Sequence, residues 1–342
     1  MIAVREAAPA DEPTLLRLAA VPMPGWVRLR YDYGAGYAAA EALKGDRVKI
    51  LVVESPEKGI LGCTTRAVRE CWLDGRPVRI GYQSGTRSFP EARKGFGFFR
   101  GLVRVRELTD ADPCALDFTT VLDDNAEALA LFTSGRAGLP KFADAGRILT
   151  WTVAGRGVAE CGPTDWSELQ SFYNREAPRR PMFPVFGPSV RERFSPDDFV
   201  TVRRDGRLVA AAAVWRHGAT RRIFVDGYAS RLFAFARPVV NFGVRLAGRP
   251  ALPPAGGEFA CAYLAFVLVE NDDSALFAEL VRVAAAKAGP ANLVLSLHER
   301  DSLVATMKRF PAWTYASRLL TYSFAGEPRP FDGIPHIEAG AL

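Results

Sequence analysis

The sequence lacks several features that would assign it to a class at once. No apolar run approaches the roughly 20 residues that cross a bilayer, and residues 1–6 lack the charged-then-apolar layout of a secretory signal. We therefore expect no membrane span and a cytoplasmic location. The 5 cysteines include no CxxC spacing and the 3 histidines are dispersed. We predict neither a disulfide framework nor a metal site.

The composition describes a folded protein of about two domains. The chain has 342 residues, of which 49% are hydrophobic and 24% charged, which is enough apolar material for packed cores. The net charge of +6 contains no block of like charges, so we expect no nucleic-acid partner. A modest positive excess favours an anionic ligand such as a nucleotide or CoA, although an arginine-rich composition alone also explains it.

Periodicity and turn residues predict the order of elements in the first half. A short strand is followed by a helix that Asp11 opens and by a second helical stretch near residues 37–43. Three strands then form a meander, and an amphipathic helix, a strand, a helix that ends at Gly135 and a last strand complete the half. The expected strands are residues 2–6, 48–54, 59–71, 78–89, 116–121 and 148–153.

The second half repeats this order. Helices are expected at residues 165–177, 230–246, 274–287 and 302–310, and strands at 199–204, 208–216, 222–228, 261–269, 293–297 and 317–324. The tetrapeptide Leu-Val-Arg-Val at 102–105 recurs at 280–283 in the matching helix. We predict an α/β protein in which two domains, 1–155 and 156–330, each carry a mostly antiparallel sheet flanked by helices. Residues 331–342 are expected to form an extended tail.

One segment indicates a phosphate site. A strand ends at Phe89, a basic loop containing glycine follows, and a helix begins beside Gly95 and Gly97. The first turn of a helix offers amides without intrahelical partners and partial positive charge, glycines admit phosphate oxygens, and Arg93 and Lys94 add charge. A solvated glycine-containing turn is the alternative, because a lone GxG is a weak signal.

At these residues the sequence resembles the GNAT superfamily of CoA-dependent N-acyltransferases. The run Pro-Glu-Ala-Arg-Lys-Gly-Phe-Gly at 90–97 is similar to the family signature of the fourth strand and following helix, with one residue fewer before the first glycine. In strict spacing Ala92 would take the Arg/Gln position. The run from Asn125 to Phe132 resembles the family's next helix, so the resemblance covers about residues 1–155 and extends to the second half only in element order.

The resemblance implies an acyl-CoA, acetyl-CoA or a longer one, between the fourth and fifth strands. It places the pantetheine at the backbone near Arg87, Ser88 and Phe89, and Asn125 near the CoA arm. The pyrophosphate would meet the signature loop, namely Arg93, Lys94, Gly95, Phe96, Gly97 and Phe98. At the position that corresponds to Phe132, family members often carry a tyrosine that protonates the leaving thiolate, which phenylalanine cannot do. The other interpretation of Phe132 is a packed aromatic residue.

The expected activity is transfer of an acyl group, most simply acetyl, to a primary amine of a small molecule or peptide. The alternative is an inactive GNAT-fold module that retains acyl-CoA affinity. Tyr82 is a candidate proton donor, and Glu70 and Asp117 are candidate general bases on strands. In the second half Asp272 and Asp273 would repel a pyrophosphate, so we expect that half to shape the acceptor site. Leu342 could supply a chain-terminal carboxylate base, as in some tandem relatives, only if the tail folds back.

Overall fold

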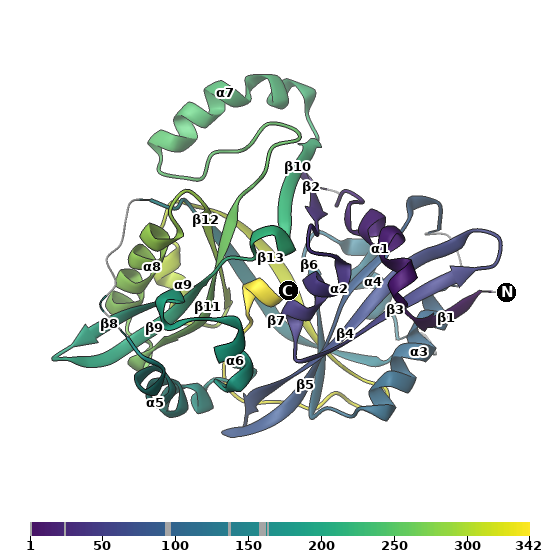
Figure 1. Ribbon diagram of the computed structural model, residues 1–342, viewed down its shortest axis with the longest axis horizontal. Helices are drawn as coiled ribbons and strands as arrows, with labels where there is room; N and C mark the ends of the chain where they lie inside the picture. The colour runs from purple at the N-terminus through teal and green to yellow at the C-terminus, as the bar shows by residue number, and fades with distance from the viewer. Residues whose placement is uncertain (1, 24, 93–96, 136–137, 157–161, 163) are drawn as a thin grey trace.

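A computed structural model describes residues 2–23, 25–92, 97–135, 138–156, 162 and 164–342. Within these ranges eleven strands form one sheet in the order β1-β3-β4-β5-β6-β13-β7-β12-β11-β9-β8. Neighbouring strands are antiparallel except β5 with β6 and β11 with β12. The predicted mixed, mostly antiparallel sheet flanked by helices is confirmed (Figure 1).

The first half contributes one end of this sheet. Asp74 and Gly75 both adopt positive φ, at 51° and 71°, which is the backbone of the tight turn that joins the two long strands of a hairpin. Helices cover both faces, because α1 and α2 pack on one side of β4 and α3 on the other. The elements are β1 (Ala3–Glu6), α1 (Glu12–Ala19), α2 (Tyr37–Glu41), η2 (Ala42–Lys44), β3 (Arg47–Ser55), β4 (Gly59–Leu73), β5 (Arg76–Ser88), α3 (Gly97–Ala111), β6 (Leu116–Leu122) and α4 (Ala126–Phe132).

The second half repeats the plan with the same turn chemistry, since Asp205 and Gly206 have φ of 51° and 76°. Its elements are α5 (Trp166–Glu176), α6 (Pro188–Arg193), β8 (Phe199–Arg204), β9 (Arg207–Trp215), β11 (Cys261–Val269), α8 (Ser274–Ala288), β12 (Asn292–His298) and α9 (Val304–Met307). Helix α9 is shorter than the predicted 302–310. After Met307 the amides of Arg309 and Phe310 bond to carbonyls three residues earlier, so the chain no longer makes α-helical hydrogen bonds. Pro311 follows, and proline disfavours helical backbone at the residue that precedes it.

The two halves exchange strands at the centre of the sheet. Strand β7 (Lys141–Val153) follows the first half in sequence but pairs with β12 and β13. Strand β13 (Ala312–Ser323) follows the second half but pairs with β6 and β7. One continuous sheet therefore crosses from one half to the other, and the domain boundary at residue 155 stays a prediction.

A separate two-stranded ribbon connects the halves. Strand β2 (Val27–Asp32), which the sequence reading missed, pairs with β10 (Arg222–Tyr228) outside the main sheet. The ribbon leads into α7 (Arg231–Leu246), which stands apart from the body of the molecule at the top of Figure 1. Among the described residues no helix is long and apolar enough to cross a membrane.

The end of the predicted extended tail returns to the centre of the molecule. Residues 331–338 are irregular and lead to η8 (Ala339–Ala341). Ile337, Glu338 and Ala341 are buried, and η8 lies against β11, β12 and η2. Figure 1 shows this end of the chain beside α2.

Candidate functional site

The strands β5 and β6 pair over four residues and then part. The last parallel pair joins Gln83 to Thr119; we call residues 83–88 of β5 and 119–122 of β6 the first fork. The amide of Phe89 donates to the Leu61 carbonyl on β4 at 3.1 Å. Because backbone groups alternate sides along a strand, the amide of Ser88 faces away from β4, into the fork. Residues 84–88 thus offer β5 backbone groups that β6 does not use.

A β-bulge lies at the apex of the first fork. Thr65 pairs with Ser84 and Cys63 with Arg87, so two residues of β5 lie opposite one residue of β4. The first of the two is Gly85, whose φ is +61°. A Cβ at Gly85 would lie 3.2 Å from Glu41 Oε2 and 3.5 Å from Lys44 Nζ, so the glycine permits both the bend and the close approach of these two side chains.

The residues over the bulge form a buried ion pair. Lys44 Nζ donates to both carboxylate oxygens of Glu41, at 2.8 and 2.7 Å, and the two side chains are 5% and 1% exposed. Burial lowers the pKa of Lys44, and the neighbouring Arg221 and Arg87 guanidinium groups act in the same direction against Glu41. Sequence reasoning placed this stretch on a helix but did not single out the pair.

Polar side chains at the fork have atoms that the protein leaves unsatisfied. The hydroxyl oxygens of Thr65 and Ser84 and the Gln83 Oε1 are buried and meet no hydrogen-bond partner in the part of the chain that the structure describes. Buried polar groups are seldom left without a partner. The Thr65 and Ser84 hydroxyls share one face of the sheet and mark a place where a polar ligand would be satisfied, whereas the neighbouring Gln83 points to the opposite face.

The predicted proton donor Tyr82 lies just before the first fork, in the part of β5 that still pairs with β6. Its ring stacks on Phe118 at 4.7 Å between centroids, and its hydroxyl lies 3.0 Å from Thr120 Oγ1. Burial raises the pKa of Tyr82 to about 12, so the phenol keeps its proton at neutral pH. Tyr82 lies on the same face of the sheet as Ser84, Thr65 and the Glu41–Lys44 pair, because residues two apart on a strand share a face.

The two predicted general bases lie elsewhere. Asp117 pairs with Gly81, one residue from Tyr82, and therefore points to the opposite face of the sheet. There it accepts a 2.9 Å hydrogen bond from Arg66, and burial raises the pKa of its carboxyl. Glu70 is exposed and pairs with Arg79 near the β4–β5 turn, roughly 20 Å along β5 from the bulge at 3.3 Å per residue. The structure thus does not bring Tyr82, Glu70 and Asp117 together.

The proposed cofactor residues fall into three groups. Helix α3 begins at Gly97, as predicted, whereas Arg93, Lys94, Gly95 and Phe96 lie outside the described residues and Phe98 is described only by its backbone. Arg87 donates to carbonyls at the end of α1, at 3.2 Å for Ala19 and 3.1 Å for Val21. The Arg87 side chain therefore caps a helix. What β5 presents to the fork is its backbone.

The two remaining residues pack as ordinary helix residues. Asn125 is the N-cap of α4, where its side-chain oxygen accepts the Ala128 amide at 3.2 Å. The ring of Phe132 stacks on Phe142 with centroids 4.9 Å apart. The interpretation of Phe132 as a packed aromatic agrees with this contact.

The second half carries the same fork and bulge, filled by the chain itself. Strands β11 and β12 part after the pair Tyr263 and Val294; we call residues 263–269 and 294–298 the second fork. Two residues of β11 again oppose one of β9, and the first, Phe266, has φ of +54°. Its amide donates to Glu338 Oε1 at 2.8 Å. The carboxylate of Glu338, from the returned tail, thus binds the bulge residue of the second fork. The matching bulge residue of the first fork is Gly85.

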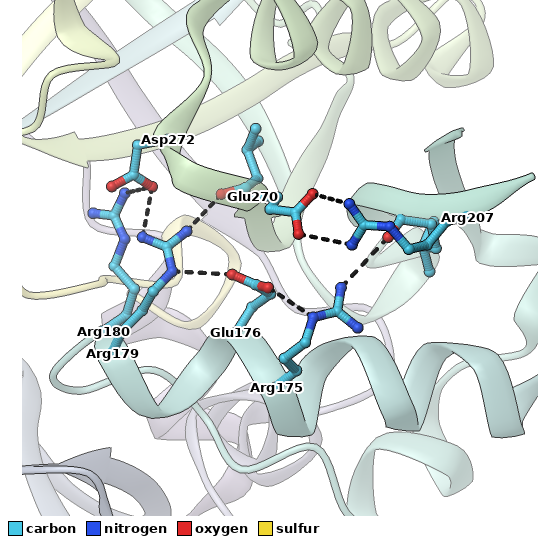
Figure 2. Close-up of polar contacts among 9 residues, drawn as sticks. Arg175, Glu176, Arg179, Arg180, Arg207, Glu270 and Asp272 are labelled. Carbon is cyan, nitrogen blue, oxygen red and sulfur yellow. Dashed lines mark hydrogen bonds and ion pairs between the residues drawn. The ribbon is translucent and has the colours of Figure 1, made fainter. Parts of the chain in front are cut away.

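The helix after the second fork is closed to anions. Asp273 Oδ1 accepts the amides of Ala275 and Leu276, at 2.7 and 2.9 Å, in the first turn of α8. Asp272 accepts hydrogen bonds from Arg179 and Arg180, and Glu270 accepts two from Arg207, as Figure 2 shows. The donors at this helix terminus are therefore already paired with carboxylates of the chain.

Arg221 ties the tail to the ribbon between the forks. It is buried and donates to the backbone oxygens of Gly340 and Leu342, at 2.9 and 2.6 Å. Its Nε lies 3.2 Å from His217 Nδ1. Burial, together with the nearby charge of Arg221, lowers the pKa of His217 to about 2, so this histidine is neutral in the folded protein.

No protein-family model matches the chain, and no curated protein matches it in sequence. Solved structures do match. Saccharomyces cerevisiae N-myristoyltransferase with bound myristoyl-CoA superposes with a TM-score of 0.60 at 9% identity, over 96% of this chain and 84% of that one. A GCN5-related N-acetyltransferase from Sphaerobacter thermophilus gives 0.51 at 13% identity, over 100% and 98%.

A third match is the GCN5-related glucosamine N-acetyltransferase region of a fungal multi-domain GH3 β-N-acetylglucosaminidase. It gives a TM-score of 0.57 at 14% identity, over 94% of this chain and 38% of that chain. The chain therefore has the GNAT fold, and the resemblance read from residues 90–97 and 125–132 is confirmed at the level of the fold.

Proposed function

We propose that the protein is an N-acyltransferase that moves an acyl group from an acyl-CoA to an amine at the first fork. The observation that carries the proposal is the unpaired stretch of β5 beside the Gly85 bulge, with buried hydroxyls that lack partners. The likeness to N-acetyltransferases and to an N-myristoyltransferase crystallised with myristoyl-CoA supports it. These proteins share only the fold with this chain, so the activity rests on the site.

The first fork suits a pantetheine arm followed by a diphosphate. The arm carries amides, which pair with strand backbone groups such as the Ser88 amide, and its polar atoms would satisfy the Ser84 and Thr65 hydroxyls. The helix that follows, α3, begins at Gly97, where the first-turn amides attract phosphate oxygens. An acyl-CoA would supply an activated thioester at the apex of the fork.

The assigned roles follow from position and charge. Glu41, held by Lys44 beside the bulge, accepts the proton that the acceptor amine loses as its nitrogen bonds to the acyl carbon. Tyr82, still protonated at neutral pH, gives a proton to the sulfur as the carbon–sulfur bond breaks. The cycle closes when Glu41 releases its proton to water and the Tyr82 phenolate takes one up, so that the net change is one proton lost by the amine and one gained by the thiol.

The second half would shape the acceptor pocket. Its fork holds the Glu338 carboxylate and its helix terminus holds Asp273, so it lacks free donors for a diphosphate. Segment 339–341 lies against η2, the turn that carries Lys44. An amine reaching Glu41 would therefore approach between the first half and the returned tail.

The test has two stages. Thermal unfolding is measured with acetyl-CoA and longer acyl-CoAs; a ligand at 100 times its Kd stabilises by about 2.7 kcal/mol. Release of free thiol is then followed across a panel of amines. We expect stabilisation by at least one acyl-CoA and thiol release that depends on an amine. The absence of any stabilisation would overturn the proposal.

A pair of matched variants locates the site. Gly97→Asp adds a carboxylate to the first turn of α3 and should weaken acyl-CoA binding about tenfold or more. Ser274→Asp adds the same charge to the first turn of α8 and should leave the affinity unchanged. Equal effects of the two substitutions would mean that the diphosphate does not bind at α3.

A module that binds acyl-CoA without turnover is the second candidate. It is favoured by Phe132, which packs on Phe142 where family members often carry a tyrosine, and by the separation of Glu70 and Asp117 from the fork. Binding with a flat thiol trace across diverse amines would support it. Loss of thiol release in Tyr82→Phe, with acyl-CoA binding intact, would exclude it.

A further inference from the structure

Helix α7 exposes a continuous apolar stripe. Among the described residues, the large hydrophobic side chains with the greatest exposure, 68 to 86%, all belong to this helix. They are Leu232, Phe235, Val239, Phe242 and Leu246. Spacings of three and four residues place them on one face of a helix. A soluble surface seldom carries such a contiguous patch without a use.

The opposite face of α7 is fastened to the protein, which fixes the direction of the stripe. Ser230 caps the helix by accepting the Phe233 amide at 3.2 Å. The buried Asn241 side chain exchanges two hydrogen bonds with the Leu252 backbone, at 2.8 and 2.9 Å. The Phe233 ring packs on Trp26 with centroids 4.6 Å apart. The stripe is therefore held outward and is not a loosely packed core face.

The charge around the stripe has one sign. From Ser230 to Arg249 the charged residues are Arg231, Arg237, Arg245 and Arg249 alone. A cavity of about 390 Å³ lies at the end of α7, and its lining includes Arg156, Arg245 and Arg249 against the single carboxylate of Glu258. This side of the molecule thus combines apolar side chains with a surplus of guanidinium groups.

We propose that α7 docks the protein on a bilayer that contains anionic lipids. Aromatic and aliphatic side chains on one face of a fixed helix enter the boundary between headgroups and acyl chains, and arginines beside them meet lipid phosphates. A second copy of the chain fits less well. Pairing two stripes would bring Arg231 close to Arg231 or Arg245 of the other copy in either orientation, with no acidic residue on the helix to compensate.

Vesicle co-sedimentation tests the proposal with the full chain. The probes are phosphatidylcholine vesicles with and without 30% phosphatidylglycerol. We expect the bound fraction on anionic vesicles to exceed that on neutral vesicles at least tenfold and to fall as salt rises. Phe235→Glu with Phe242→Glu should reduce binding at least tenfold, and Arg231→Glu with Arg245→Glu should remove the preference for anionic lipid.

The control is Val103→Glu, which places the same charge on another exposed apolar residue, 58% exposed, on α3. It should bind vesicles as the unaltered protein does, and circular dichroism should show all variants folded. Failure of the unaltered protein to bind, or full binding by the Phe235 and Phe242 variant, would overturn the proposal. Sedimentation that shows a dimer of the unaltered protein and a monomer of this variant would also overturn the proposal, because the stripe would then be covered by a second copy. None of these outcomes depends on acyl transfer.

Discussion

The two forks share a backbone plan and differ in what occupies them. In each, two parallel strands part after a few pairs and a bulge with a positive φ follows, at Gly85 in the first and at Phe266 in the second. The amide of Phe266 is bonded to Glu338 from the returned tail. Beside Gly85 there is a buried ion pair and there are hydroxyls without partners. The chain itself fills the second fork, and the first fork is the site that we propose for acyl-CoA.

The helices after the forks differ in the same direction. Asp273 satisfies the first amides of α8, whereas the residues read from the sequence before α3 are basic and glycine-containing. Carboxylates of the chain thus accept in the second half the amides whose counterparts in the first half we propose for the polar groups of an acyl-CoA. The expectations below test this contrast, beginning with the largest effect.

The buried charge at the first fork should give the largest effect. Lys44→Met leaves Glu41 buried without a partner, and we expect the free energy of unfolding to fall by about 3–5 kcal/mol. The double variant Glu41→Gln, Lys44→Met removes both charges and should regain most of that loss while acyl transfer stays low. Urea unfolding and thiol release measure the two quantities. A double variant that is both stable and active would make the pair structural only.

The bulge of the first fork should tolerate no side chain. Gly85→Ala adds a Cβ against Glu41 and Lys44, and we expect acyl-CoA affinity to fall about 100-fold, or about 2.7 kcal/mol. Gly75→Ala in the β4–β5 turn has a similar φ and nothing within 4 Å of the added Cβ. It isolates the backbone strain of about 1–2 kcal/mol. Equal acyl-CoA affinities in the two variants would count against the apex as the site.

A histidine of the second half, His217, should give the stability of the protein a pH dependence below pH 6.5. His217 has a pKa of about 2 when folded and about 6.5 when unfolded. The folded protein holds His217 neutral, so the contribution of this residue to the free energy of unfolding is complete above pH 6.5. It is lost as the pH falls from 6.5 toward 2. At pH 5 the loss should be about 2 kcal/mol at 1.36 kcal/mol per unit. His217→Gln should flatten the fall in unfolding free energy between pH 6.5 and 5; an unchanged slope would mean that other groups dominate it.

The occupant of the second fork should matter least. Glu338→Ala leaves the Phe266 amide without its acceptor, and we expect a loss of about 1.5 kcal/mol in unfolding free energy. Glu338→Gln keeps an oxygen in place and should lose less. Neither should change acyl-CoA affinity measured by thermal shift. A gain of acyl-CoA binding stoichiometry in Glu338→Ala would show that the second fork is masked and still able to bind.

Local patterns predicted most of the fold. Alternation and turn residues located β3, β4 and β5 to within a few residues, and Asp273 was recognised as a helix-terminal acid. The strand β2 was missed although its residues alternate apolar and charged. The exchange of β7 and β13 could not be seen, because the pairing of strands far apart in sequence leaves no trace in either strand alone.

The candidate site was predicted in part. Tyr82 and the start of α3 follow from strand and helix patterns, but the sequence does not reveal which face a strand residue shares with a distant helix. Asp117 and Tyr82 are therefore separated by the sheet despite their neighbouring registers. Glu41 and Lys44 are three residues apart on a short helix, a spacing that usually marks a solvated pair. Only the packing of α2 and η2 shows that this pair is buried.

The central exchange of β7 and β13 has a consequence for how the protein can be divided. A polypeptide ending near residue 155 would lack β13, the strand that lies between β6 and β7. The remaining polypeptide would lack β7, the strand that lies between β12 and β13. Each fragment alone would present unpaired strand edges, which promote aggregation. Produced together, the two fragments should complete one another, so separate expression of the halves is the wrong way to ask what either one binds.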